Sequence, residues 1–462
     1  MSIDTAIANW TARIRDRYSA KAVWPAGYAG AYLGMGARDP VFTGPEHACL
    51  IIGPPRSGKT TSTIIPAVAL WDGPAVTTST KADIAHVTNS ARSRHGQTWL
   101  WDPTGRVPLP AGVQPLQWSP LAGCADWDTA IDRAWILAQS ARPDPTGDAV
   151  HWTERAAALL APLLHGAALG GHDLRGLLEW IHQRETFAAL DQLSKKPATA
   201  VAHNLLCGIA RTEHRELSGI WSTADSILAA YRSTRTLDAA CHPNFDPAAF
   251  AQTSGTAHFV APASRAAQHA PIICALLDQI RQHTQQPAQP SQQGDRQARQ
   301  ASQRSVVRRP MLWALDELAN VAPLPNLPAI VADAGSQGLL VLACLQDLSQ
   351  ARARWGAQAD GLLTLFATTL LLPGVADPQT LRTVTTLAGK VDRPQHSHTR
   401  TGILKNQHTT STRPLPLLPE SVIANGKPGH ALHLKATQPT WLQLTPWHTT
   451  PWIANHITGA TR

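Results

Sequence analysis

Apolar residues follow two patterns along this chain of 462 residues. Short apolar runs bounded by turn-forming residues are typical of buried strands. Longer segments between them carry an apolar residue every three or four positions, which is typical of helices. Strands that alternate with helices predict an α/β fold, in which helices cover both faces of a parallel sheet. The strand-like runs lie at 49–52, 74–78, 99–101, 256–261, 311–315, 339–344 and 365–372.

The pattern changes between 126 and 245. Segments such as AIDRAWILAQSA and WTERAAALLAPLLHGAAL have helical periodicity, and no strand-like run interrupts them. We therefore predict an all-helical insert. A second change comes at 283–310, which is rich in Gln and lacks periodicity, so it predicts a disordered linker. On one interpretation the Arg residues of this linker touch DNA, and on the other they belong to a solvated tether.

The most specific motif directly follows the first strand-like run. It has the spacing Gly-x-x-x-x-Gly-Lys-Thr of a phosphate-binding loop, and a helical segment at 61–71 continues from it. The glycines let the backbone approach anionic oxygens, which the helix N-terminus also attracts. Lys59 is predicted to reach the β- and γ-phosphates of ATP, and Thr60 to ligate Mg²⁺. The predicted nucleotide-binding residues are Gly53, Pro54, Pro55, Arg56, Ser57, Gly58, Lys59, Thr60 and Thr61.

The other half of an ATPase site is predicted at the end of the run 311–315. Asp316 and Glu317 follow it, at the strand end where ligands bind in open α/β sheets. We predict that Asp316 holds Mg²⁺ and that Glu317 is the general base on the attacking water. Gln346 follows the next run and is predicted to contact the terminal phosphate or the water, with a helix-capping role as the alternative. The predicted catalytic residues are thus Glu317, Lys59 and Gln346.

These patterns divide the chain into consecutive segments. The nucleotide-binding domain is interrupted twice, because its strands resume after the insert and again after the linker. The predicted boundaries are 1–48 for an N-terminal lead-in with a helical start, 49–125 for the first part of the nucleotide-binding domain, 126–245 for the all-helical insert, 246–282 for the continuation of the nucleotide-binding domain, 283–310 for the linker, 311–392 for the second part of that domain and 393–462 for a C-terminal segment with short strands.

Charge and cysteine content change this picture little. The formal net charge of +8 is spread along the chain and only weakly favours polyanionic partners. The 6 cysteines are scattered without a CxxC pair, which is typical of reduced core thiols in a cytoplasmic protein. No His pair has Cys or carboxylate company at zinc spacing, so no metal other than Mg²⁺ is predicted. The most apolar window, 361–376, is too short for a membrane span.

Four segments together resemble the TraG/TraD family of conjugative coupling proteins, the ATPases of type IV secretion systems. The third is the most specific, with Asp-Glu, Ala-Asn, Pro-Asn and then Gln-x-Leu-x-Gln. The segments are GPPRSGKTTSTIIPAVALW at 53–71, VTTSTKADIAHVT with TWLWDPTG at 76–105, LWALDELANVAPLPNLPAIVADAGSQGLLVLACLQDLSQARARWG at 312–356 and RPLPLLPESVIANGKPGHALHLKATQPTWLQLTPW at 413–447.

The resemblance implies a RecA-like P-loop NTPase fold with an inserted helical domain, assembled as a homo-hexamer that hydrolyses ATP with Mg²⁺. The insert would recognise relaxase-bound single-stranded DNA, which the motor delivers to the components of a type IV secretion apparatus. Lys59, Thr60, Asp316, Glu317 and Gln346 keep the roles given above. By the same likeness, three further residues are expected near the nucleotide or the subunit contact: Lys81, Asp83 and Asp102.

Two departures from the family's pattern matter. Family members usually have N-terminal transmembrane helices, and none is predicted here. We therefore expect a cytoplasmic protein recruited to the inner face of the cell membrane, with a separate membrane-anchor protein as partner. Many relatives also have an Arg that could reach a neighbour's nucleotide, but 333–337 reads DAGSQ. Arg352 and Arg354 are candidates for that role, and a plain basic helix face is the alternative.

Two other functions stay open from the sequence. One is a cytosolic double-stranded DNA translocase, which the lack of a predicted membrane anchor favours and the helical insert disfavours. The other is a non-hydrolysing adaptor that binds nucleotide and presents a relaxase to partners. Glu317 argues against the adaptor, because a protein that only binds nucleotide has no need of a general base.

Overall fold

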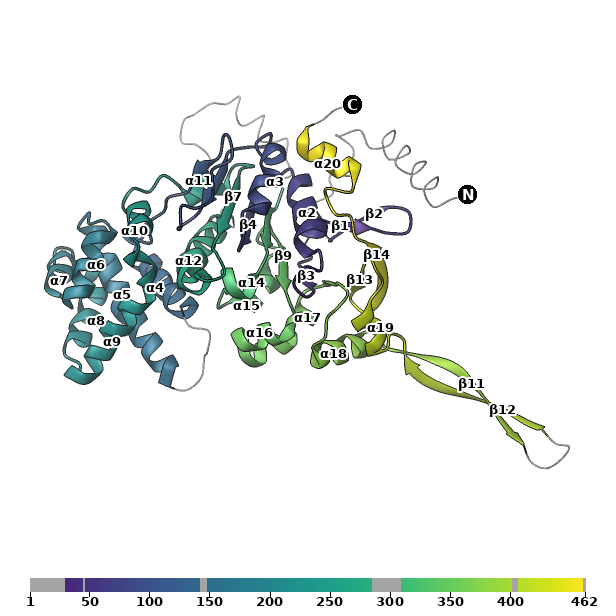
Figure 1. Ribbon diagram of the computed structural model, residues 1–462. Coiled ribbons are helices and arrows are strands. Elements are labelled where there is room, and N and C mark those ends of the chain that lie inside the picture. The colour runs from purple at the N-terminus through teal and green to yellow at the C-terminus, as the bar shows by residue number, and fades with distance from the viewer. Residues whose placement is uncertain (1–29, 45, 142–147, 285–308, 401–405, 460–462) are drawn as a thin grey trace, which may run out of the picture.

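The fold is described from a computed structural model of the chain (Figure 1). It describes residues 30–44, 46–141, 148–284, 309–400 and 406–459. The helical start predicted for the lead-in and most of the predicted linker, 285–308, lie outside these ranges.

A 12-stranded sheet runs through the described residues, in the order β2-β1-β14-β13-β10-β3-β9-β8-β4-β7-β5-β6. From β10 to β6 every neighbouring pair is parallel, whereas β13, β14, β1 and β2 extend the sheet by antiparallel pairs. The strands are β1 (Tyr32–Met35), β2 (Pro40–Phe42), β3 (Cys49–Ile52), β4 (Ala75–Ser79), β5 (Thr98–Trp101), β6 (Gln114–Pro115), β7 (Thr256–Val260), β8 (Met311–Leu315), β9 (Leu339–Leu345), β10 (Thr368–Leu371), β13 (His430–Lys435) and β14 (Gln438–Gln443).

Each strand-like run of the sequence is a strand of this sheet, so the predicted α/β fold is confirmed. The run at 365–372 is the least accurate, because a short helix, α17 (Leu362–Leu365), precedes the shorter strand β10. The strands β1 and β2 were not predicted. Their sequence is rich in Gly, which weakens any local strand signal, and β1 is held by pairing with β14 from the far end of the chain, where Met35 lies opposite Gln443.

Helices cover both faces of the sheet, and alternate residues of each strand face different cores. Leu312 and Ala314 pack in one core, together with helices α2 (Ile65–Leu70), α3 (Asp83–Arg92) and α20 (Pro451–Thr458). Trp313 and Leu315 pack in the other core. That core is lined by α12 (Ala266–Thr284), α14 (Leu318–Val321), α15 (Leu327–Asp333), α16 (Leu348–Trp355) and α18 (Pro378–Ala388).

The second core continues into the helical region at the left of Figure 1. Among the described residues, only helices lie between β6 and β7, as the helical periodicity predicted. They are α4 (Trp127–Ser140), α5 (Asp148–Leu169), α6 (Leu174–Gln183), α7 (Phe187–Ser194), α8 (Ala200–Ala210), α9 (His214–Ile227), α10 (Thr234–Cys241) and α11 (Pro247–Ala251), with short 3₁₀ turns between some of them.

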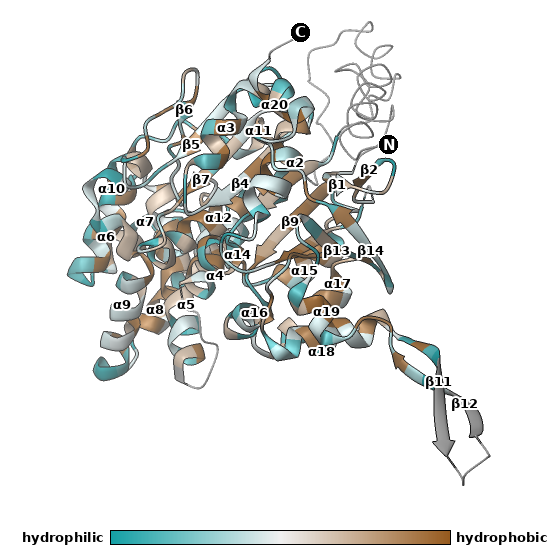
Figure 2. Cartoon of the chain, turned by 45° about the vertical axis from the view of Figure 1, so that its right-hand side comes forward, coloured by the Kyte–Doolittle hydropathy of each residue, from teal (hydrophilic) through white to brown (hydrophobic). Residues whose placement is uncertain are grey.

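A long hairpin leaves the body next to α18 and α19 (Glu420–Asn425), and Figures 1 and 2 show it pointing away from the sheet. Its strands, β11 (Lys390–Arg400) and β12 (Asn406–Pro416), pair with each other in a separate two-stranded sheet. We refer to residues 390–416 as the arm. The sequence did not predict it, because neither strand has the apolar alternation that marks a strand packed on a core.

Candidate functional site

Three strands bring the predicted site residues to one edge of the sheet. β9 lies between β3 and β8, with Leu345 opposite Ile52 and Ala343 opposite Leu315. Gly53, Gln346 and Asp316 directly follow these strands, and all three strands run in the same direction. Residues far apart in the sequence therefore meet at the carboxyl ends of adjacent parallel strands, where open α/β sheets bind ligands.

The loop after β3 is compact and folded around its own lysine. Gly58 has φ of 95°, and Arg56 has φ of 64°, which is unusual for a residue with a side chain. The ammonium of Lys59 donates to the carbonyl of Gly53 and to that of Pro54, the latter at 3.0 Å. The loop thus holds Lys59 with its charge directed at backbone oxygens, and the residue is only 8% exposed.

The helix after the loop begins as a π turn. This turn spans Thr60–Ile64, and the N–H of Ile65 donates to the carbonyl of Thr60, five residues earlier. Pro66 explains the widening, because it has no N–H for the carbonyl of Ser62. In an α-helix the N–H of Ile65 would donate to the carbonyl of Thr61. Here that N–H donates to Thr60 instead, and the carbonyl of Thr61 accepts the N–H of Trp447 at 3.1 Å. The helix predicted at 61–71 is therefore a π turn followed by α2, and π turns of this kind are frequent at functional sites.

Asp316 joins this loop to the end of β8. The hydroxyl of Thr60 donates to Oδ2 of Asp316 at 2.7 Å, and the hydroxyl of Thr78 donates to its backbone carbonyl at 3.0 Å. Asp316 is 5% exposed. Burial raises the pKa of this carboxyl, which the Thr60 hydrogen bond partly offsets, while the charge of Glu317 raises the pKa further. The two predicted metal ligands, Thr60 and Asp316, are thus in direct contact.

Glu317 follows Asp316 directly, and Gln346 follows the adjacent strand β9. Glu317 has φ of 55°, in the left-handed region, and its carboxylate accepts the side-chain N–H of Asn320 at 2.9 Å. A non-glycine residue in this region is strained, and such strain clusters at functional sites. Gln346 is half-buried at the end of β9. The helix-capping alternative for Gln346 is wrong, because Asp347 caps α16 by accepting the N–H groups of Ser349 and Gln350.

The loop has features that suit a phosphate group. The hydroxyl of Ser57 is buried, and within the described residues it has no hydrogen-bond partner. A Cβ on Gly53 would lie 2.7 Å from that hydroxyl and 2.9 Å from Cβ of Leu372, so glycine is required by packing as well as by the motif. A buried polar atom without a partner is costly unless a ligand satisfies it. The residues present therefore fit a phosphate and, through Thr60 and Asp316, a hard cation such as Mg²⁺.

The substitution Gly53→Ala is expected to weaken ATP binding by roughly ten- to a hundredfold, since overpacking of this kind costs about 1–3 kcal/mol. Titration calorimetry of the purified variant checks this. Gly208→Ala is the matched control, because a Cβ there meets no atom within 4 Å. Equal ATP affinities for Gly53→Ala and the parent protein would show that the ligand does not use this loop.

The candidates for a trans-acting arginine are held by their own chain. Arg352 forms an ion pair with Asp377 at 3.1 Å. Arg354 donates to the carbonyls of Gln139 and Pro323, each at 3.1 Å. A plain basic helix face does not describe these two residues, because both side chains make specific contacts that hold α16 against its neighbours. The trans-acting role of Arg352 or Arg354 stays a prediction.

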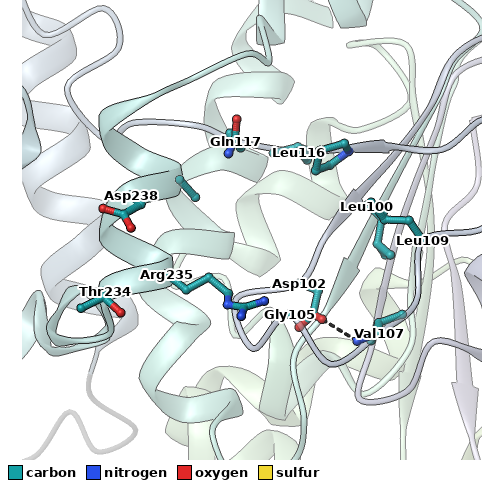
Figure 3. Close-up of a pocket in the computed structure, with 12 residues that line it drawn as sticks. Leu100, Asp102, Gly105, Val107, Leu109, Leu116, Gln117, Thr234, Arg235 and Asp238 are labelled. Atoms are coloured by element: carbon teal, nitrogen blue, oxygen red, sulfur yellow. Dashed lines mark hydrogen bonds between the residues drawn. The ribbon is translucent and has the colours of Figure 1, made fainter.

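The three secondary candidates lie farther along the same edge of the sheet. Lys81 follows β4, Asp83 begins α3 and Asp102 follows β5. The carboxylate of Asp102 accepts the N–H groups of Thr104 and Val107, each at 2.8 Å, so it shapes its own loop. Beside this loop lies a pocket of about 560 Å³. Figure 3 shows Arg235 of α10 pointing across it toward the Asp102 loop.

Two comparisons with known proteins gave matches. A family model matches one segment of the chain, and solved structures match the fold along most of the chain. Residues 310–427 match the family described as the TraM recognition site of TraD and TraG. No curated protein matches the chain. The resemblance to the TraG/TraD coupling proteins is confirmed for this segment. The matched TraG/TraD segment contains β8, β9 and β10, and with them Asp316, Glu317 and Gln346.

Solved structures of a coupling protein have the same fold. The unbound form of the bacterial conjugative coupling protein TrwBdeltaN70 is 16% identical, with a TM-score of 0.66 over 91% of this chain and 89% of that chain. TrwB with the non-hydrolysable ATP analogue ADPNP is 16% identical, with a TM-score of 0.64 over 90% and 89%. TrwB with ADP and Mg²⁺ is 16% identical, with a TM-score of 0.61 over 87% and 86%.

Throughout the described part of the chain, none of the helices combines the length and the apolar character needed to cross a bilayer.

Proposed function

We propose that the chain binds ATP with Mg²⁺ in the loop after β3 and hydrolyses it to drive the movement of DNA. The observation that carries this proposal is the 2.7 Å hydrogen bond between the Thr60 hydroxyl and the Asp316 carboxylate. It joins the phosphate-binding loop to the acidic strand end, and these are the two halves of a P-loop ATPase site. TrwB structures with ADPNP and with ADP and Mg²⁺ support the same assignment by analogy.

The roles follow from the positions of the side chains. The backbone of Gly53, Pro54, Pro55, Arg56, Ser57, Gly58, Lys59, Thr60 and Thr61 surrounds the phosphates in this proposal. Lys59 exchanges its contacts with the carbonyls of Gly53 and Pro54 for the β- and γ-phosphates, which are stronger acceptors because they are charged. Thr60 and Asp316 hold Mg²⁺, which when bound neutralises charge on the phosphate oxygens.

Glu317 acts on water in this scheme. Its neighbour Asp316 is buried and serves the metal, whereas Glu317 is half-buried at the strand end and bound by one neutral amide, that of Asn320. A carboxylate with remaining acceptor capacity can orient a water molecule and take its proton. Gln346, one strand away, contacts the terminal phosphate or orients the same water. Lys81, Asp83 and Asp102 are assigned to the outer edge of the nucleotide site or to a subunit contact.

The proposed substrate is single-stranded DNA attached to a relaxase. The helical insert recognises it, and a homo-hexamer delivers it to a type IV secretion apparatus, with a separate protein as membrane anchor. The family segment at 310–427 and the TrwB-like fold support a role in conjugation. The predicted division into 1–48, 49–125, 126–245, 246–282, 283–310, 311–392 and 393–462 remains our proposal for the domains.

The proposal is tested by measuring ATP hydrolysis of the purified full-length chain with and without DNA. We expect turnover that requires Mg²⁺ and rises with single-stranded DNA, because the motor works on that substrate. Stimulation by duplex DNA alone would instead favour a double-stranded DNA translocase. Tight ATP binding without turnover, with either DNA and with a membrane-anchor partner added, would favour the adaptor.

A further inference from the structure

The arm, residues 390–416, contributes no residue to the proposed ATPase site. Its strands β11 and β12 have 11 residues each, so the ribbon is about 35 Å long at about 3.3 Å per residue. Figures 1 and 2 show that only its base approaches the body, near α18 and α19. Within the described residues, β11 and β12 pair only with each other. An isolated two-stranded ribbon is at best marginally stable in water, so a free arm of this length calls for a partner.

The charge of the arm is strongly positive. Its sequence has one acidic residue, Asp392, against a larger set of basic residues: Lys390, Arg393, Arg400, Lys405 and Arg413. Histidines add donors at 396, 398 and 408. Strands β11 and β12 carry most of these basic residues on a narrow projection. Such a projection attracts polyanions.

Two of these arginines face each other across the ribbon. Arg393 lies directly opposite Arg413 in the antiparallel register, and both residues are exposed. Among the ion pairs of the described residues, neither arginine takes part. Like charges that lie opposite each other destabilise a ribbon. The repulsion between the two arginines destabilises the ribbon in the free protein. A bound polyanion would neutralise both charges and remove this repulsion.

The composition of the two strands disfavours a protein partner. Apart from prolines, the strands contain one aliphatic pair, Val391 and Leu415, which face each other at the base and are 36% and 37% exposed. Stable protein interfaces have an apolar core from which charged residues are depleted. The sequences of the two strands otherwise contain Gln, Ser, Thr, Asn and His, residue types that are common donors to phosphate oxygens and base edges.

We propose that the arm binds DNA, lying as a two-stranded ribbon in a groove of the duplex with Arg393 and Arg413 on the phosphate backbone. The major groove is about 12 Å wide and admits such a ribbon. This inference adds duplex DNA as a further partner, beside the single-stranded DNA proposed above. It is independent of hydrolysis, so its test is made without nucleotide, and its failure leaves the ATPase proposal standing.

The test measures binding of the full-length chain to a short random-sequence DNA duplex at several salt concentrations. For Arg393→Gln with Arg413→Gln we expect weaker binding and a log–log salt slope that is smaller by about 2, because each phosphate contact contributes about 0.9. Lys427→Gln with Lys435→Gln removes the same charge from exposed positions on the body. This control pair is expected to change the slope much less.

A second variant separates binding from ribbon stability. Arg393→Glu places a carboxylate opposite Arg413, which should stabilise the ribbon while it repels phosphate. We expect slower amide exchange in the arm together with weaker DNA binding. An unchanged affinity and salt slope in both arm variants would overturn the proposal. So would a loss of self-association with DNA binding intact, since the arm would then serve contacts between copies of the chain.

Discussion

Lys59→Ala is expected to reduce ATP turnover by about 10²- to 10³-fold or more, because it removes the cation that stabilises charge developing on the phosphates. Lys59 is the loop's own positive charge, and it already lies inside the loop on the carbonyls of Gly53 and Pro54. The same ammonium is proposed to bind the β- and γ-phosphates before they react, so ATP affinity should fall along with turnover. Steady-state hydrolysis and calorimetric ATP binding, measured on the same preparation, check both effects.

The control for this experiment is Lys196→Ala, which removes an exposed lysine of the helical insert. It should hydrolyse ATP at the parent rate. Thermal unfolding of Lys59→Ala separates a local from a global effect, since a folded but inactive variant has a melting temperature close to that of the parent. Parent-like turnover in folded Lys59→Ala would remove the loop after β3 from the catalytic site.

Glu317→Gln is expected to lower turnover by roughly 10²- to 10⁴-fold while it leaves ATP binding intact. The amide keeps the size of the carboxylate and can still accept from Asn320, which donates to it at 2.9 Å. It cannot take a proton from water. The variant should therefore accumulate as an ATP-bound form, which a single-turnover experiment with labelled ATP detects as bound, uncleaved nucleotide.

The matched control here is Glu179→Gln, an exposed position on α6. Asp316→Asn provides a contrast, because loss of the buried carboxylate beside Thr60 should weaken the dependence on Mg²⁺ as well as turnover. If Glu317→Gln and the parent hydrolyse ATP at equal rates, another group must activate the water and the assignment of Glu317 is wrong.

The sequence predicted the parts of this molecule that local patterns determine. The run 311–315 is apolar because β8 is buried on both faces, so the pattern also located Asp316 and Glu317 at the strand end. The hydrogen bond between Thr60 and Asp316 could be anticipated only from two motifs whose joint function is known. The two residues lie 256 positions apart, and no local pattern in the sequence indicates that they are in contact.

The features that sequence reasoning missed have no local apolar or residue-type pattern that predicts them. β1 is a strand because it pairs with β2 and, at Met35, with β14, and the Gly-rich sequence around Tyr32 contains no apolar pattern that predicts this. The left-handed conformation of Glu317 arises from the turn between β8 and α14, and no residue-type preference for Glu predicts it. The arm has polar strands without a core, so apolar periodicity had nothing to detect.

The bond between Trp447 and Thr61 has a consequence for how the loop helix is wound. If the π turn at Thr60–Ile64 tightened into an α-helix, the N–H of Ile65 would move from the carbonyl of Thr60 to that of Thr61. Trp447 already donates to that oxygen, and a hydrogen bond contributes about 0.5–1.5 kcal/mol. A carbonyl oxygen has two lone pairs, so that of Thr61 can accept from Trp447 and Ile65 together. The amide of Trp447 therefore joins the segment after β14 to the phosphate loop in either winding of the helix.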